Sequence, residues 1–323
     1  MDAHAFLRDL ERKPEALRRL ADSLNEGSPW PEEVPPRVVM IGMGSSRFAA
    51  GAIATGLRAA GIEAVAELSS LAAGTPPGAS VLAVGISASG ETEETIEAIA
   101  RHRGTSMTVA LTNRPGAAIE RAADSVVAMQ AGDEEGGVAC RSYQHTLALL
   151  MVLAAPASGR SVAAVADSMR RAAEASDDLL ERSDTWLPPV AELLAEGPAT
   201  FTIAPAERLS SAEQGALMLR EGPRRTADAC ESGDWLHVDV YLTKSLDYRA
   251  LLFAGSRFDP TIMRWICERG SKVVAVGGDV DDAHLTVRYR HDDDPEVALL
   301  TEVLVAEMVA ARWWIASQVR ERR

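Results

Sequence analysis

The feature that most constrains the fold is a repeated alternation of short apolar runs with longer segments of helical periodicity. The runs at 38–42, 80–87 and 106–113 are apolar along most of their length, and each is followed by a segment with helical spacing of its apolar residues. Strands that are apolar on both faces belong to parallel sheets covered by helices on both sides. The first half of the chain therefore predicts an α/β fold with a parallel sheet.

The same alternation returns after a mostly helical stretch over 138–180. It predicts strands in ATFTIAPAE, YRALLFAG, KVVAVGGD and LTVRYRH, with helices over 210–222, 259–270 and 294–320. Helices are also expected over 3–25 and in PGAAIERAA, and the alternating segment DWLHVDVY is expected to be a strand. We interpret the chain as two α/β domains of similar topology. The first, with an N-terminal helix, spans 1–155, and the second, with a closing helix, spans 156–323.

Composition and charge exclude several classes of function. The net charge of -14 argues against a nucleic-acid partner, which usually requires a basic surface. The longest apolar run, TLALLMVLAAPA, is too short to span a membrane, and the charged N-terminus does not resemble a signal peptide. Three cysteines without CxxC spacing predict neither disulfides nor a zinc site. HDDDPE, at 291–296, precedes a helix, where acidic residues suit the helix dipole better than a metal. We expect a cytoplasmic protein that has no cofactor.

One strand-to-helix junction, GISASGETEET, carries more hydroxyl groups than a turn needs. Ser87, Ser89 and Thr92 surround Gly90 where a strand ends and a helix begins. The first N–H groups of a helix have no partner within the helix and attract anions, and ligands of parallel sheets lie beyond the carboxyl ends of the strands. Ordinary helix capping uses the same residue types, so the loop alone fits a cap or an anion site equally well.

A second loop of the same chemistry, IGMGSSRFAAG, follows the preceding buried strand. It places Gly44, Ser45 and Ser46 between that strand and its helix. Two such loops can hold one phosphate together, so the pair favours an anion site over two caps. Neither loop contains the GKS or GKT of a P-loop or a complete GxGxxG, so the motifs do not predict a nucleotide.

These segments resemble the sugar isomerase (SIS) domain family. SASGET resembles the family's phosphosugar loop, and GMGSS resembles its first serine-containing loop. The segments at 133–150 and 212–239 resemble the isomerase half of glucosamine-6-phosphate synthase, and stand-alone phosphosugar deaminases and deglycases look similar. The resemblance covers roughly residues 35 to 320. It implies two tandem SIS-like three-layer αβα domains with flavodoxin-like parallel sheets.

The resemblance also implies roles for individual residues. Glu221 matches the glutamate that moves a proton between C1 and C2, and His237 matches the histidine associated with ring opening. In the family this histidine reaches the site from the partner subunit, which implies a homodimer with its active site at the subunit interface. Without the resemblance, Glu221 would be read as a solvated charge at a helix end and His237 as an ordinary strand residue. The positions matched to the phosphorylated sugar are Gly44, Ser45, Ser46, Ser87, Ala88, Ser89, Gly90, Thr92, Val138, Cys140 and Gln214.

Four departures from the synthase pattern bear on the reaction. Met218 stands where the synthase has a lysine, Gln214 where it has a glutamate, Ala88 where it has a glutamine, and Cys140 where it has a serine. We also expect no glutaminase segment and no lysine-containing C-terminal tail. We expect an aldose–ketose isomerase, deaminase or deglycase acting on an amino-sugar or ketosamine phosphate, and these departures favour deamination or deglycation over the synthase reaction. The alternative is a catalytically inactive SIS protein that binds a sugar phosphate as a sensor.

Overall fold

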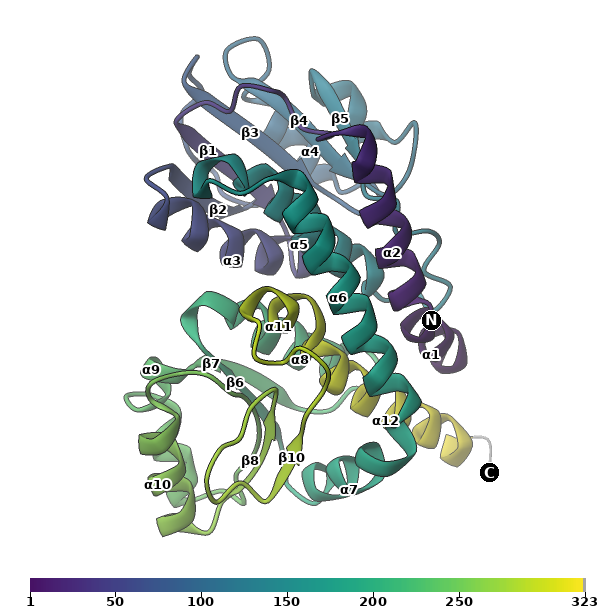
Figure 1. Cartoon of the computed structure of the whole chain (residues 1–323), viewed down its shortest axis with the longest axis vertical. Coiled ribbons are helices and arrows are strands. Elements are labelled where there is room, and N and C mark those ends of the chain that lie inside the picture. The colour runs from purple at the N-terminus through teal and green to yellow at the C-terminus, as the bar shows by residue number, and fades with distance from the viewer. Residues whose placement is uncertain (322–323) are drawn as a thin grey trace. The chain divides into compact units, whose positions relative to one another are not determined.

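The computed structural model describes residues 1–321, which form two compact units with one parallel sheet each (Figure 1). The first unit comprises Ala16–Asp133 and Arg141–Met169, and the second comprises Met1–Glu15, Glu134–Cys140 and the chain from Arg170 onward. The predicted boundary after residue 155 stays a prediction. No helix among the described residues is long and apolar enough to cross a membrane.

The two sheets have the same topology. The first has the order β2-β1-β3-β4-β5 and the second the order β7-β6-β8-β9-β10, and all neighbouring strands are parallel. Numbered within each unit, both orders read 2-1-3-4-5, the flavodoxin-like arrangement. The predicted fold class, two tandem three-layer αβα domains with flavodoxin-like parallel sheets, is confirmed.

In the first unit, helices cover both faces of a buried sheet. All six residues of β3 are buried, as expected for a central parallel strand. Figure 1 shows α3 and α5 together on one face and α4 on the other. The core on the α4 side contains Val39, Ile41, Val81, Ala83 and Ala98. The elements are β1 (Arg37–Gly42), α3 (Ser45–Ala59), β2 (Glu63–Leu68), β3 (Val81–Ile86), α4 (Glu93–Ala100), β4 (Met107–Thr112), η2 (Ala118–Ala122), β5 (Ser125–Ala128) and α5 (Arg141–Ala154).

The second unit repeats this layering. Phe201 and Ile203 face a core completed by Trp235 and by Ile262 of α10. Thr202, on the opposite face of the sheet, donates a hydrogen bond to the carbonyl of Ala212 in α8. The elements are α1 (Ala3–Glu11), α7 (Ser183–Ala195), β6 (Thr200–Ala204), η4 (Ala206–Arg208), α8 (Leu209–Glu221), β7 (Ala227–Glu231), α9 (Ser232–Trp235), η5 (Asp239–Lys244), β8 (Arg249–Phe253), α10 (Asp259–Arg269), β9 (Lys272–Val276), β10 (Leu285–Val287), α11 (Pro295–Thr301) and α12 (Val303–Glu321). Two long helices, α2 (Lys13–Ser23) and α6 (Val162–Glu181), have residues in both units.

Two of the predicted helices are interrupted. The helix expected over 3–25 is divided at Arg12 into α1 and α2. Pro14 explains this break, because it has no N–H group and its ring conflicts with the carbonyl four residues earlier. The closing helix expected over 294–320 is divided at Glu302, a fully buried residue whose carboxylate pairs with Arg208.

Two other local predictions were wrong. The segment PGAAIERAA forms the short 3-10 helix η2 rather than an α-helix. DWLHVDVY is not a strand but contains the end of α9, a turn with His237, and the start of η5. The side chain of Glu231 accepts hydrogen bonds from the N–H groups of Gly233 and Asp234, and this cap starts a helix directly after β7.

Candidate active site

The loop after β3 brings three of the predicted hydroxyl groups together. Ser87 Oγ lies 3.0 Å from Thr92 Oγ1 and 3.4 Å from Ser89 Oγ. Ser87 is buried, whereas Ser89 is exposed. The two serines also order the turn, because Ser87 Oγ accepts the N–H of Gly90 and Ser89 Oγ accepts that of Glu91. The hydroxyls therefore lie in a preformed loop.

The start of α4 does not use Thr92 as a side-chain cap. Thr92 occupies the N-cap position, but its hydroxyl contacts Ser87 and makes no capping hydrogen bond. By contrast, Asp2, Glu231 and Asp294 accept hydrogen bonds from the first N–H groups of their helices. Helix α4 thus begins without a side-chain acceptor for these donors, and an anion could take that position.

Gly90 is required by packing. Its φ of 68° is in the left-handed region, and a Cβ there would lie 2.3 Å from Ala117 Cβ and 2.8 Å from Thr112 Oγ1. The carbonyl of Gly90 accepts the N–H of Ile119, which ties the loop to η2. The glycine lets the hydroxyl loop pack closely against the segment after β4.

We expect Gly90→Ala to lower the free energy of unfolding by roughly 1–3 kcal/mol, because the methyl group overpacks the loop and strains its backbone. Chemical denaturation measures this loss. Gly51→Ala is the matched control, since no atom lies within 4 Å of a Cβ at this position in α3. Alanine should leave stability unchanged or raise it there. Equal effects at both positions would contradict the packing account.

The second hydroxyl loop lies between β1, which neighbours β3 in the sheet, and helix α3. Gly44 is the N-cap residue of α3, with φ 49°, and Ser45 and Ser46 form the first turn. An ideal Cβ on Gly42 would lie 3.4 Å from the carbonyl oxygen of Ile86, so the ends of β1 and β3 are close together. This is the switch point of a 2-1-3-4-5 sheet, where ligands of such folds bind. The structure therefore brings both predicted loops to one edge of the first sheet.

Glu221 is the last residue of α8, in the second unit. Its side chain is exposed, yet nearby protein partly desolvates the carboxylate and raises its pKa, while Arg220 opposes this shift. The helical repeat places Gln214 and Met218 on the same face of α8 as Glu221. A carboxylate with a raised pKa suits a general base.

The segment that carries Val138 and Cys140 is buried in the second unit. Gln214 Nε2 donates a hydrogen bond to the carbonyl of Ala139 at 2.9 Å, which links this segment to α8. The backbone N–H of Cys140 donates to Glu134 Oε1 at 2.7 Å. Burial raises the pKa of the Cys140 thiol well above its usual value, so the sulfur is a neutral thiol. Three of the predicted binding residues thus lie close to one another.

His237 is exposed, and its imidazole makes no hydrogen bond or ion pair with any residue in the described chain. The turn that carries it is anchored on both sides. Trp235 Nε1 donates to Tyr248 Oη at 2.8 Å, and Tyr248 Oη donates to Asp239 Oδ2 at 3.2 Å. Tyr248 also stacks on Phe201 with a centroid distance of 4.2 Å. Local sequence patterns did not predict this network, and its only signal was the cluster of aromatic residues around DWLHVDVY.

We expect Tyr248→Phe to destabilise the protein by about 1–3 kcal/mol, because it leaves the buried Trp235 N–H and the Asp239 carboxylate without their shared partner. If the network positions His237, turnover should also fall. The same substitution should then have no further effect on turnover in a His237→Ala background. A loss of turnover of equal size in both backgrounds would show that the network acts independently of His237.

Comparisons with known proteins relate the first unit to one domain family. Residues 34–156 match the family model of the SIS domain. This chain contains a SIS domain. The match includes both hydroxyl loops, from the residues before β1 to the end of α5. In sequence, this chain is 23% identical over 312 residues to the isomerizing glutamine–fructose-6-phosphate aminotransferase of Sulfurisphaera tokodaii. That alignment covers 94% of this chain and 51% of the relative, so the chain spans about half the relative's length.

Solved structures show the same fold across both units of this chain. The C-terminal domain of glucosamine-fructose-6-phosphate aminotransferase from Francisella tularensis superposes with a TM-score of 0.86 at 16% identity, covering 98% of this chain and 99% of that one. Glucosamine-6-phosphate deaminase from Thermotoga maritima superposes with a TM-score of 0.76 at 18% identity, covering 97% of this chain and 95% of that one.

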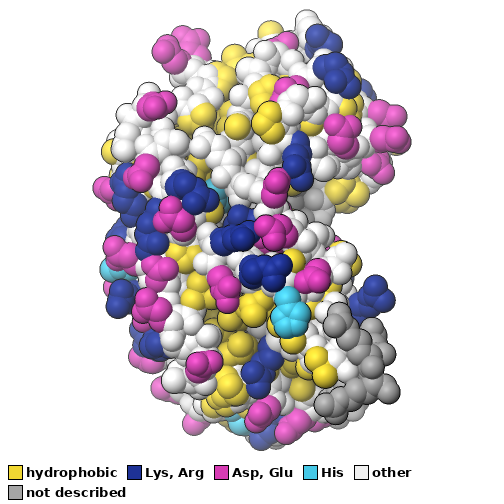
Figure 2. Space-filling view, turned by 90° about the vertical axis from the view of Figure 1, so that its right-hand side faces the viewer, with side chains coloured by type: hydrophobic (Ala, Val, Ile, Leu, Met, Phe, Trp, Pro, Cys, Tyr) yellow, Lys and Arg dark blue, Asp and Glu magenta, His cyan; other side chains and the backbone are white. Residues whose placement is uncertain are grey.

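On the face shown in Figure 2, basic and acidic side chains are interspersed among the described residues, and no continuous basic field is seen there.

Proposed function

We propose that this SIS protein is an enzyme that acts on an amino-sugar or ketosamine phosphate, as an aldose–ketose isomerase, deaminase or deglycase. The observation that carries the proposal is the hydroxyl cluster of Ser87, Ser89 and Thr92 at the uncapped start of α4. Hydroxyl groups and the free N–H groups of a helix start can together donate hydrogen bonds to the oxygens of a phosphate. Ser45 and Ser46, in the first turn of α3 after the neighbouring strand β1, would hold the same group.

The proposed chemistry begins with opening of the sugar ring, assisted by proton exchange with His237. Glu221 then removes the proton from the carbon beside the carbonyl or iminium, giving an enediol or enaminol. Return of this proton to the adjacent carbon completes isomerisation. With an amino substrate the same proton return gives an imine, and addition of water to this imine releases the amine and leaves a carbonyl group, which completes deamination or deglycation. The raised pKa of Glu221 supports its role as base, because a pKa shifted toward the working pH makes a carboxyl group better at both accepting and returning a proton.

We also propose that the active unit is a homodimer in which His237 enters the site of the partner subunit. The imidazole is exposed without a partner among the described residues, and Val238 and Tyr241 beside it are 57% and 61% exposed. Mixing inactive Glu221→Gln and His237→Ala proteins should restore about a quarter of wild-type activity, because half of the dimers then contain one complete site. No recovery after verified subunit exchange would contradict the shared site.

A second candidate function is supported by one observation. Met218 is buried on the face of α8 that carries Glu221, where the family resemblance expects a lysine. A thioether cannot transfer protons, so the protein would be a sugar-phosphate-binding regulator without turnover if this lysine were indispensable.

One set of assays separates the two candidates. The protein is incubated with fructose 6-phosphate, glucosamine 6-phosphate and a fructose-amino-acid 6-phosphate, while sugar interconversion and amine release are followed. Thermal shift with the same compounds reports binding. Turnover that is lost in Glu221→Gln supports the enzyme, and binding without turnover supports the regulator. The absence of both would contradict the phosphosugar assignment.

A further inference from the structure

The second sheet has a cavity of about 910 Å³ that the proposed chemistry does not use. Its walls come from the segments after β8 and β9 and from the start of α11. Arg208, which follows β6, also lines it. Strands β6 and β8 are neighbours in a 2-1-3-4-5 sheet, so the cavity lies at the switch point of the second unit. It is the topological counterpart of the hydroxyl-loop site in the first unit.

The loop after β8 differs from the loop after β3 in one decisive respect. The N–H groups of Gly255 and Ser256 donate hydrogen bonds to Asp259 Oδ2 at 2.8 and 3.0 Å. A carboxylate of the protein itself therefore accepts the hydrogen bonds that these two N–H groups could otherwise donate to an anionic ligand. This arrangement disfavours phosphate and places a negative charge at the switch point.

The remaining wall is strongly acidic. Arg208, one of two arginines in the wall, is already engaged by Glu302 at 3.0 Å. Arg288 pairs with Asp279 and Asp292. Four further carboxylates of the wall have no ion pair within the described chain: Glu268, Asp281, Asp282 and Asp293. Arg264 is the second wall arginine, so the cavity keeps an excess of negative charge after the internal pairs are formed.

Two buried polar atoms have no hydrogen-bond partner, one in a residue of the cavity wall and one in a residue that packs against the wall. Asp259 is only 7% exposed and lines the cavity, yet its Oδ1 atom is unpaired. Tyr289 is 5% exposed, and its unpaired hydroxyl lies 2.9 Å from an ideal Cβ on Gly277, another residue of the wall. Leaving such groups unsatisfied costs free energy, and a ligand that reached the Asp259 carboxylate with a hydrogen-bond donor would recover part of it.

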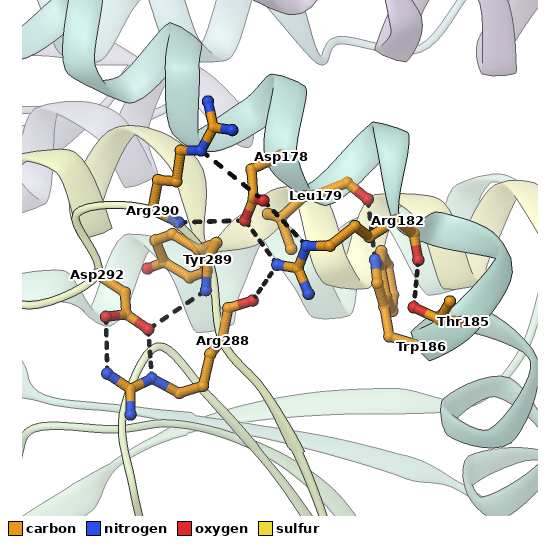
Figure 3. Close-up of polar contacts among 9 residues, drawn as sticks. All are labelled: Asp178, Leu179, Arg182, Thr185, Trp186, Arg288, Tyr289, Arg290 and Asp292. Carbon is orange, nitrogen blue, oxygen red and sulfur yellow. Dashed lines mark hydrogen bonds and ion pairs between the residues drawn. The ribbon is translucent and has the colours of Figure 1, made fainter.

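Asp292, a residue of the cavity wall, lies in a segment that polar contacts hold in place (Figure 3). Asp178 of α6 accepts hydrogen bonds from Arg182 at 2.9 Å and from the backbone of Arg290 at 3.2 Å. Arg182 also donates to the carbonyl of Arg288, whose own side chain holds Asp292 at 2.9 Å. A wall held in this way loses little freedom when a ligand binds.

We propose that this cavity binds an organic cation with primary ammonium groups, of the diamine or polyamine class. One ammonium group would pair with Asp259, and the other would lie near Asp281 and Asp282. The apolar wall residues Met263 and Ala298 offer contact to the methylene chain. A metal ion fits less well, because residues 1–321 contain no group of three or more His, Cys, Asp or Glu side chains placed to hold one. The proposal is independent of the chemistry at Glu221.

Isothermal titration calorimetry of the full chain with spermidine and putrescine tests this proposal. We expect saturable one-to-one binding that Asp259→Asn weakens at least about tenfold. The asparagine oxygen can still accept the N–H groups of Gly255 and Ser256, so the loop should persist. Asp281→Asn combined with Asp282→Asn, at exposed positions that should not affect folding, provides a second test and should also weaken binding.

The controls decide between a specific site and general attraction to an acidic protein. Glu97→Gln removes one exposed carboxylate from the first unit and should leave binding unchanged. If Glu97→Gln weakens binding as much as Asp259→Asn does, the cavity is not the site and the proposal fails. It fails equally if magnesium alone or inorganic phosphate binds there while the amines do not.

Discussion

Replacing Glu221 with glutamine is expected to lower kcat/KM for the phosphosugar substrate by about 100- to 10,000-fold, with little change in substrate affinity. Glutamine keeps the shape of the side chain but cannot accept the proton. The substrate phosphate would still be bound by the loops after β1 and β3, which contain no part of α8. Steady-state kinetics with each candidate substrate checks the loss, and thermal shift checks that binding persists.

The pH dependence of the wild-type enzyme follows from the same residue. Desolvation raises the pKa of Glu221, and the base works only when it is deprotonated. Activity should therefore rise with pH through a midpoint above the ordinary glutamate range, and this acidic limb should disappear from the residual activity of Glu221→Gln. An acidic limb at the ordinary glutamate pKa, or one that persists in the variant, would assign the limb to another group.

Replacing Lys13 with methionine is expected to destabilise the fold by about 3–5 kcal/mol, because it leaves the buried Glu307 carboxylate without its counterion. Lys13 Nζ lies 2.5 Å from Glu307 Oε2, and both side chains are completely buried. The other carboxylate oxygen of Glu307 already lacks a hydrogen-bond partner. Urea denaturation of the variant and the wild type measures the difference.

A double variant separates the buried charge from the packing. Lys13→Met combined with Glu307→Leu removes both charges, and its stability should return close to that of the wild type or exceed it. Burial raises the pKa of Glu307, so protonation of this residue favours the folded state. The deficit of Lys13→Met should therefore shrink at low pH and grow as pH rises through the raised pKa. A deficit that is the same in the double variant and independent of pH would point to packing alone.

The sequence predicted those features that depend on neighbouring residues. Continuous apolar runs identified the central strands, and hydroxyl residues spaced around Gly90 identified the loop at the start of α4. Strand β7 was missed because it is an edge strand of the sequence ADACE, only partly buried and without an apolar run. The alternation around His237 was wrongly interpreted as a strand. Trp235 and Val240 are buried, but they belong to the short helix α9 and the 3-10 helix η5.

Features that join distant segments could not be predicted from local patterns. Lys13 and Glu307 lie 294 positions apart, and nothing in the sequence near either residue indicates an ion pair. In the sequence, Asp259 resembles any acidic residue at the start of a helix. Only the structure shows that its carboxylate accepts hydrogen bonds from the backbone N–H groups of the loop after β8. The roles of Glu221 and His237 came from family resemblance, and they remain predictions.

The central claim, that Glu221 moves a proton on a phosphosugar, is tested most directly by isotope exchange in deuterium oxide. Fructose 6-phosphate and glucosamine 6-phosphate are each incubated with the protein, and NMR follows deuterium at C1 and C2. The account predicts that the wild type introduces deuterium at one of these carbons in at least one substrate and that Glu221→Gln does not. Deuterium uptake at the same rate in both proteins, or none in the wild type with a substrate shown to bind, would contradict it.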